Sequence, residues 1–321
     1  MKPIRAFFGA LTVLLIVSPA TSQVQYPDRP IRFVVGFTAG SATDITARIF
    51  AQKFAEAWNV AVIVENAQGA GGSVAGDRVA KAAPDGATLY WGANGALTIN
   101  PTLQPHPTYD VVRDLTPIAR LIVAPSIIAI NNDVRAKNLS DLIALAKAEP
   151  GKLTYATPGV GTPQHVAGEL LKSLAGIDIV HIPYRGAVFT DVIGGRVTIA
   201  IQNMGAILPL VQEGELHGLA VTSLHRTPIM PSLPTVAESG FADFEAISWF
   251  GLLAPTGTPN PIIDKIYRQA ATIAAMPDVR EKLAQLGVDT TADPPAVFAE
   301  IIKSDIAKWE KVIRDSHIAL E

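Results

Sequence analysis

The chain has 321 residues, 49% of them hydrophobic, and a formal net charge of −3. This length allows two domains of common size, and nothing in the slightly acidic balance suggests a protein that binds nucleic acids or anionic lipids. The absence of cysteine excludes disulfide bonds, thiolate chemistry and a lipid anchor on an N-terminal cysteine.

The first 22 residues have the features of a secretory signal peptide. Lys2 and Arg5 precede a mostly apolar stretch at 6–17, and Ala20 and Ser22 are small residues at the −3 and −1 positions of a cleavage site. The apolar stretch is too short to span a membrane. We therefore expect an exported protein that is soluble after removal of residues 1–22.

The stretch 31–44 predicts a buried strand, a tight turn and the start of a helix. Residues 31–37 are mostly β-branched, aliphatic or aromatic, and residues 38–42 are all small. Thr43 and Asp44 are residue types that start helices. Free N–H groups and the positive end of the helix dipole at such a start can hold an anion, although a purely structural turn has the same pattern.

Two more strands are predicted before residue 100, and each is followed by small residues. A strand at 60–65 leads into the Gly-rich loop 66–73 and a helix at 74–82. A strand at 88–92 ends in the loop 93–96. Because ligands of open α/β sheets bind at the carboxyl ends of the strands, we expect the loops after these strands to share one rim.

The apolar segment 118–130 contains Pro125, which is not tolerated inside a central strand, so we predict two strand pieces there. Further on, residues 153–156, 157–163 and 164–175 repeat the order of strand, small loop and helix start. Other predicted strands lie at 178–183, 197–202 and 216–222, and other helices at 138–147, 205–212, 261–275, 277–286 and 295–315.

Two crossings, one near Pro125 and one within 244–255, predict an α/β protein with two lobes. Residues 23–124 and 250–321 would form a discontinuous first lobe, and residues 125–249 would form the second. Two lobes joined by two strands make a hinge with a cleft between them.

The sequence contains no clear catalytic or cofactor-binding motif. The glycine-rich loop fails the dinucleotide fingerprint, because Val74 occupies the place of its last glycine, and it also fails G-x-S-x-G. The histidines show no metal-ligand spacing, and we expect no metal and no cofactor. A Ser-His-Asp triad is not excluded by spacing, and Arg185 could pair with a ligand carboxylate or be purely structural.

Taken together and in order, many short motifs resemble the Bug-type periplasmic receptors of tripartite tricarboxylate transporters. These motifs lie at 26–31, 43–44, 64–66, 69–72, 83–86, 100–101, 161–165, 183–186, 234–238 and 249–255. The resemblance implies a two-lobed periplasmic binding protein, type II-like, that closes on small carboxylates or dicarboxylates. It also implies that the loops 38–44 and 161–165 hold a ligand carboxylate.

The candidate ligand-binding residues come from both lobes. They are Phe37, Thr38, Ala39, Gly40, Ser41, Ala42, Thr43, Asp44, Asn94, Gly95, Gly161, Thr162, Pro163, Gln164, His165, Tyr184, Arg185, Gly186, Gln202 and Asn203. Two features depart from the family pattern: Gly40 is the single glycine of the first loop, and the loop after Tyr184 is about two residues short. Phe189 could therefore reach toward the cleft.

The main hypothesis is a non-catalytic, monomeric receptor that captures a small organic acid for transport or sensing. Its partner would be a membrane permease of the tripartite tricarboxylate transporter type or a sensor, and no nucleic acid is expected. The rival hypothesis is a secreted hydrolase that uses the same cleft. A third, the effector module of a transcription regulator, is disfavoured by the export signal and by the lack of a helix-turn-helix segment before residue 30.

Overall fold

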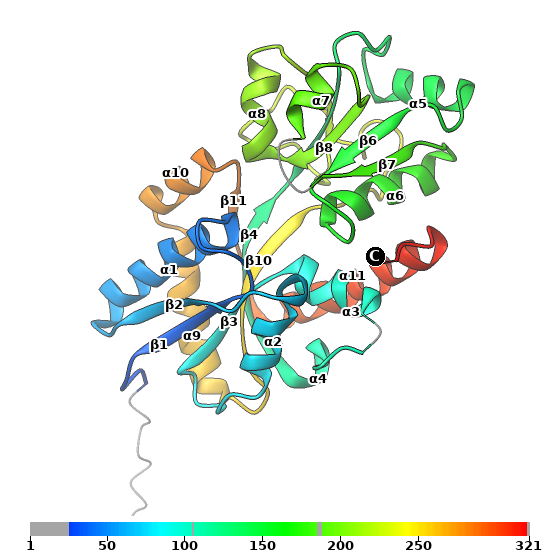
Figure 1. Ribbon diagram of the computed structural model, residues 1–321. Helices are drawn as coiled ribbons and strands as arrows, with labels where there is room; N and C mark the ends of the chain where they lie inside the picture. The colour runs from blue at the N-terminus through cyan, green and yellow to red at the C-terminus, as the bar shows by residue number, and fades with distance from the viewer. Residues whose placement is uncertain (1–25, 105, 185–187, 320–321) are drawn as a thin grey trace, which may run out of the picture.

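The computed structural model describes residues 26–104, 106–184 and 188–319 (Figure 1). The expected signal peptide and the candidate residues Arg185 and Gly186 lie outside these ranges. Within the described residues, no helix is both long and apolar enough to cross a membrane.

The first lobe is built on a six-stranded sheet with the order β11-β4-β10-β3-β1-β2. Its strands are β1 (Ile31–Val35), β2 (Val62–Asn66), β3 (Thr88–Ala93), β4 (Leu115–Ala124), β10 (Ser248–Pro255) and β11 (Asp289–Asp293). β1 pairs in parallel with β2 and β3, so the loops that follow these strands leave the sheet at one edge, as the sequence predicted. β10 runs antiparallel to both β3 and β4.

Neighbouring side chains of β1 point to opposite faces of this sheet, and each face has its own core. Phe33 is buried with residues of α1 (Ala42–Trp58), α9 (Asn260–Ala274) and α10 (Pro277–Gln285). Val34 is buried on the other face, with residues of α2 (Ser73–Ala80), α4 (Val111–Asp114) and α11 (Pro295–Asp315). Helices therefore cover both faces of the sheet (Figure 1).

The second lobe contains a five-stranded sheet with the order β7-β6-β8-β5-β9. Its strands are β5 (Ser126–Ile130), β6 (Thr154–Thr157), β7 (Val180–Pro183), β8 (Ile199–Asn203) and β9 (His217–Val221). The helices α5 (Leu139–Ala148) and α6 (Pro163–Ala175) share one core with Ile128 of β5. The helices α7 (Phe189–Ile193) and α8 (Met204–Gln212) share the opposite core with Ile127.

The predicted two-lobed α/β architecture is confirmed. β4 ends at Ala124 and β5 begins at Ser126, so Pro125 separates two strands that belong to different sheets. β10 begins at Ser248 and carries the chain back into the first sheet. The two crossing segments lie side by side, and Figure 1 shows them as the connection between the lobes.

The last helix, α11, contributes to the cores of both lobes. Phe298 and Ile302, near its start, are buried in the first lobe. Trp309, Val312 and Ile313, near its end, are buried in the core that contains α6 and β5 of the second lobe. The lobes are thus connected by packing as well as by the crossing strands.

Several short elements were not predicted. They are the π-helical turn η2 (Gly95–Ile99), the 3-10 turn η1 (Ala70–Gly72), α3 (Asn100–Leu103), α4, α7 and β11. The expectation of a simple loop at 93–96 was wrong, because the chain turns directly from β3 into η2. β11 has the sequence DTTAD, which lacks an apolar alternation, and its partner β4 supplies the pairing that makes it a strand.

Candidate functional site

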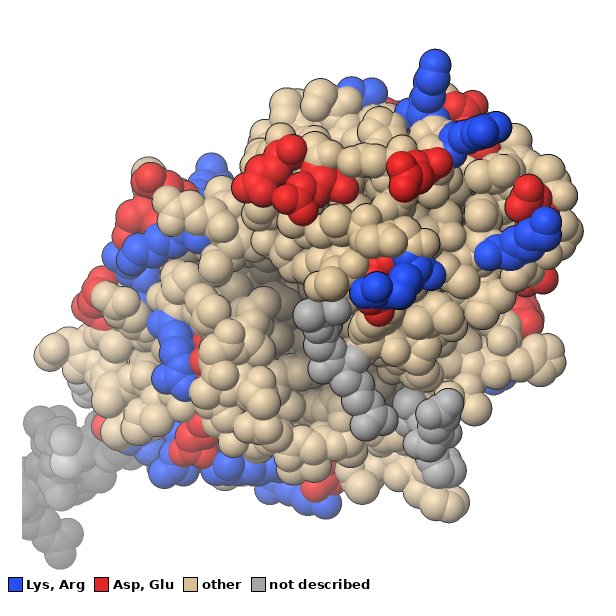
Figure 2. All heavy atoms as spheres, turned by 45° about the horizontal axis from the view of Figure 1, so that its top comes forward, with Lys and Arg blue, Asp and Glu red and all other residues tan. Residues whose placement is uncertain are grey.

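The candidate residues of the two lobes face each other across a cleft. Figure 2 shows the surface hollowed between the lobes. Gly95, the first residue of η2, lies against Pro163 at the start of α6, because a Cβ atom added to Gly95 would be 3.7 Å from Cδ of Pro163. The start of η2, after β3, and the start of α6, after β6, therefore approach each other at this point.

In the first lobe, Ser41 is the N-cap of α1. Its backbone is extended, with φ −68° and ψ 160°, and its side-chain oxygen accepts a hydrogen bond from the N–H of Asp44 at 3.3 Å. The preceding Gly40 has φ +82°, a conformation that favours glycine. A Cβ atom added to Gly40 would meet no described atom within 4 Å, so this position borders open space.

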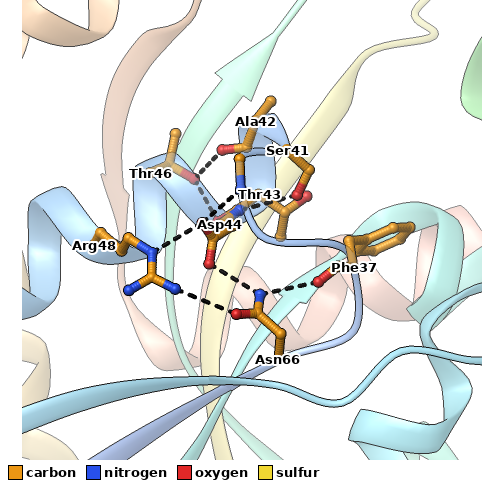
Figure 3. A network of polar contacts seen from close by, with 9 residues as sticks. Phe37, Ser41, Ala42, Thr43, Asp44, Thr46, Arg48 and Asn66 are labelled. Carbon is orange, nitrogen blue, oxygen red and sulfur yellow. Dashed lines mark hydrogen bonds and ion pairs between the residues drawn. The ribbon is translucent and has the colours of Figure 1, made fainter.

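The carboxylate of Asp44 holds the turn from inside (Figure 3). It accepts hydrogen bonds of 2.9 Å from the Gly40 N–H, from Arg48 Nε and from Asn66 Nδ2. Asn66 also donates to the carbonyl oxygen of Phe37 at 2.9 Å. Asp44 therefore fixes the loop that it follows, and its oxygens face protein donors instead of a ligand.

Burial and hydrogen bonding act in opposite directions on Asp44. Burial alone would raise the pKa of this carboxyl, but the bonds from Arg48, the Gly40 N–H and Asn66 outweigh it, so the pKa lies below the ordinary value. The side chain is only 2% exposed, and it is held as a carboxylate at neutral pH by these donors.

Donors remain free at the start of α1. The backbone N–H groups of Ala42 and Thr43 have no hydrogen-bond partner among the described residues, as expected for the first turn of a helix. The hydroxyl proton of Ser41 is also unused there. Thr38 and Ala39 are exposed, while Phe37 is half-buried with its ring against Gly72.

In the second lobe, Thr162 is the N-cap of α6. Its hydroxyl accepts the N–H of His165 at 3.3 Å and donates to the carbonyl oxygen of Gly159 at 2.7 Å. Gly161 N–H donates to Nδ1 of His165 at 3.2 Å, and Pro163 has no N–H. The N–H of Gln164 is therefore the free donor of this turn among the described residues.

His165 is stacked on His181 of β7, with ring centroids 3.8 Å apart and an interplanar angle of 11°. His181 Nε2 lies 2.7 Å from the hydroxyl of Thr157, at the end of β6. Burial lowers the pKa of His165 to about 4, although the nearby Glu169 opposes this shift. Burial, followed by the charge effects of His165 and Lys172, lowers the pKa of His181 to about 3. The pair is neutral at physiological pH.

The side chain of Gln164 contacts the first residues of the crossing strands. Its Nε2 lies 3.1 Å from Ser126 Oγ, 2.6 Å from Asn203 Oδ1 and 3.4 Å from Ser248 Oγ, so its two N–H groups are shared among three acceptors. Ser126 and Ser248 are the first residues of β5 and β10. Oδ1 of Asn203 also accepts a hydrogen bond from the Ser248 hydroxyl at 3.3 Å, and its Nδ2 group has no partner among the described residues.

Other candidate residues are engaged within the protein. Asn94 is buried, donating to the carbonyl oxygen of Ile247 at 2.9 Å and accepting the N–H of Trp249 at 3.3 Å, so it holds β10. The Tyr184 hydroxyl donates to Asp191 at 2.6 Å. Gln202 is buried, and its Nε2 has no described partner. Phe189 is partly buried against the α7–α8 core, and its reach toward the cleft stays a prediction.

The structure thus groups the candidate residues into the α1 turn, the α6 turn and a polar cluster at the crossing strands. Sequence reasoning missed Arg48, Thr157, His181, Ser126 and Ser248, which hold these groups in place. No local motif marks them, because each acts on a residue distant in sequence or one helical turn away. Asn66 was assigned only to the Gly-rich loop 66–73 and to a family motif, without a role at the site.

A depression of about 620 Å³ lies away from this site. It is bounded by α11 and by the segment that enters β10, and Trp249, Ile301 and Lys308 contribute to its walls. None of the candidate residues lines it.

Comparisons with known proteins identify the family. The model of the tripartite tricarboxylate transporter family receptor matches residues 46–318. Protein BugT of Bordetella pertussis is 32% identical, covering 100% of this chain and 99% of BugT. Rpa4515 of R. palustris, solved with adipate, is 32% identical with a TM-score of 0.78, covering 92% of this chain and 99% of its own.

A further solved structure is MatC from Rhodopseudomonas palustris with bound malate. It is 30% identical with a TM-score of 0.73, and the alignment covers 90% of this chain and 100% of MatC. The resemblance stated from the sequence motifs is confirmed by these matches. The chain belongs to the receptor family of the tripartite tricarboxylate transporters.

Proposed function

We propose that this protein is a periplasmic receptor that binds a small organic acid, a mono- or dicarboxylate, in the cleft between its lobes. The adipate and malate bound by the two similar structures support this class of ligand. The protein would deliver its ligand to a membrane permease of the same transporter type or to a sensor. We expect it to act as a monomer and to need no cofactor.

The observation that carries this proposal is the set of uncharged donors left free around the cleft. The N–H groups of Ala42 and Thr43 belong to the first lobe, and the Gln164 N–H and Asn203 Nδ2 belong to the second. Donors at helix starts favour an anion, and fixed backbone groups recognise a carboxylate without a cation. Asp44, the nearby acid, is satisfied by protein donors and does not need the ligand.

We further propose that the cleft is not catalytic. The oxygen of Ser41 caps α1, and Nδ1 of His165 accepts the Gly161 N–H. The pKa of His165, lowered by burial to about 4, makes it a weak base at neutral pH. A hydrolase would need an activated nucleophile next to a base, and these assignments give neither residue that role.

The lobes proposed for this function are residues 23–124 with 250–321, and residues 125–249. Closure on the ligand would occur about the segments near Pro125 and Ser248, where Gln164 and Asn203 of the second lobe meet the first residues of β5 and β10. A ligand that bridged the two helix starts would favour the closed arrangement.

The proposal is tested by native mass spectrometry of freshly purified protein, followed by thermal shift with C4–C8 mono- and dicarboxylates. A retained small acid, or a carboxylate that at about 100 times its Kd adds roughly 2.7 kcal/mol of stability, is the expected result. Chromogenic esters serve as the opposing test. Ester turnover that disappears in Ser41→Ala or His165→Ala would replace the receptor with a hydrolase.

A further inference from the structure

Two glycines from different lobes meet beside the crossing strands. Gly205 lies at the start of α8 in the second lobe, and Gly287 lies between α10 and β11 in the first. A Cβ atom added to Gly205 would be 2.1 Å from the carbonyl oxygen of Leu286, and one added to Gly287 would be 2.2 Å from the nitrogen of Gly205. Both distances are far below any contact that a real Cβ atom makes, so neither backbone leaves room for a side chain.

This contact lies close to the line about which the lobes are joined. The N–H of Met204, next to Gly205, donates to the carbonyl oxygen of Pro125 at 3.0 Å. Asp289, two residues after Gly287, is paired with Val123 of β4. Asp289 also accepts a hydrogen bond of 3.3 Å from Thr227 of the second lobe, so this flank joins the lobes at two points.

Local backbone conformation does not explain Gly205. It is the second residue of α8 and is absent from the glycines with positive φ, so any residue could adopt its conformation. Alanine is the better helix former, so helix propensity does not explain the glycine either. The neighbouring backbone of Leu286 and Gly287 is what leaves no space for a larger residue.

We propose that the contact between Gly205 and Gly287 sets how closely the lobes approach, and that these glycines thereby control ligand affinity from outside the cleft. The inference rests on the proposed receptor function. A methyl group at Gly205 would act as a wedge that holds α8 away from the α10–β11 turn. The ligand needs the helix starts of both lobes. A lower population of the state in which the lobes lie close together would therefore weaken binding in proportion.

The test uses Gly205→Ala, with Gly176→Ala as the control for adding a methyl group. Gly176 ends α6 with φ +61°, and a Cβ atom there would meet no described atom within 4 Å, so this control adds backbone strain without pressing on the other lobe. Because the chain contains no cysteine, Ala57→Cys on α1 and Ala144→Cys on α5 provide one spin label in each lobe. Both alanines are exposed. Label separations are measured by pulsed electron resonance without ligand and with saturating adipate or malate.

We expect wild-type protein to populate the label separation of this structure in at least one condition, and Gly205→Ala to lose most of that population. We expect the Kd of whichever acid binds to rise at least about tenfold, as follows when the competent fraction falls to about one tenth. The melting temperature without ligand should stay within the range of the Gly176→Ala control.

The inference is overturned if Gly205→Ala keeps the wild-type separations and affinity, if it binds more tightly, or if wild-type protein never populates this separation. If neither acid binds wild-type protein, adipate and malate are excluded as ligands of the proposed receptor. The label separations still test whether Gly205→Ala holds the lobes apart. If Gly205→Ala fails to fold, Gly287→Ala adds the methyl group to the same contact from the first lobe. Gly214→Ala is then the control, because Gly214 has a similar positive φ. Failure of Gly287→Ala to fold as well would make both glycines purely structural and reject the inference.

Discussion

The starts of α1 and α6 have the same design in the sequence, yet the structure holds them in place by different forces. Both follow a strand and a loop of small residues, and both have a hydroxyl N-cap, Ser41 or Thr162. The α1 turn is fixed by a carboxylate that accepts from Gly40, Arg48 and Asn66. The α6 turn is fixed by neutral groups, since Gly161 donates to a histidine that stacks on a second histidine.

The difference shows that similar backbone cradles can depend on different chemistry. A charged network tolerates loss of a partner poorly, because a buried donor or acceptor is then left unsatisfied. A stacked imidazole pair is instead sensitive to protonation, since a charge on either ring is opposed by burial and by its neighbour. The two turns should therefore fail under different changes.

The largest expected effect concerns the space next to the α1 turn. Gly40→Val would place a branched side chain where a Cβ atom meets no protein, and we expect affinity for carboxylates to fall at least about 100-fold, or about 2.7 kcal/mol. Gly214→Val is the matched control, because Gly214 also has a positive φ and open space. Calorimetric titration and circular dichroism measure binding and folding. Equal affinity of the two variants would place the ligand elsewhere.

The next effect concerns the charged network. Asp44→Asn replaces one carboxylate oxygen with an NH2 group. This new donor would face the N–H donors of Gly40, Arg48 or Asn66, with which it cannot form a hydrogen bond. We expect a loss of about 1.5–3 kcal/mol in the free energy of unfolding by urea, with weaker binding. Asp315→Asn, which breaks the exposed pair with Lys311, should change stability by less than about 0.5 kcal/mol. Equal losses in both variants would remove the special role of Asp44.

The histidine pair predicts a dependence of stability on pH. The pKa values of His165 and His181, lowered mainly by burial to about 4 and about 3, lie below that of an unfolded histidine near 6.5. The unfolded chain therefore takes up protons first, and the free energy of unfolding should fall as pH decreases from about 6.5 to 4, by at most about 1.4 kcal/mol per pH unit for each group.

His181→Gln should flatten this part of the stability curve, as measured by urea unfolding at several pH values. Asp44 acts in another window: its pKa is lowered by donors that overcome burial, so its contribution should be lost only as pH falls below the ordinary carboxyl value near 3.8. An unchanged slope in His181→Gln between pH 6.5 and 4 would show that the histidine pair does not set it.

The smallest effects compare the two caps. Ser41→Ala and Thr162→Ala each remove an N-cap bond, and each should lower the free energy of unfolding by about 0.5–2 kcal/mol. The Ser41 hydroxyl proton is free in the described structure, whereas that of Thr162 is bonded to Gly159. We therefore expect Ser41→Ala alone to lose a further 0.5–1.5 kcal/mol of ligand affinity, roughly one neutral hydrogen bond. Identical affinity losses would contradict this distinction.

The sequence by itself determined the two lobes, the order of most strands and helices, and the turns at 38–44 and 161–165. These features depend on local signals, which include apolar runs, small loops, helix caps and a proline that breaks a strand. Pro125 predicted the first crossing because its missing N–H cannot serve a central strand, and the structure has a boundary between two strands there.

The tertiary structure alone decided what each candidate residue does. Asn94 and Gln164 are buried against the crossing strands, and Asp44 is satisfied by Arg48 and Asn66. The sequence could not reveal these roles, because a side-chain amide or carboxylate bonds whichever partner the fold brings to it. The same reason applies to β11 and to the contact of Gly205 with Gly287, where the neighbour that fixes the residue lies in a distant part of the chain.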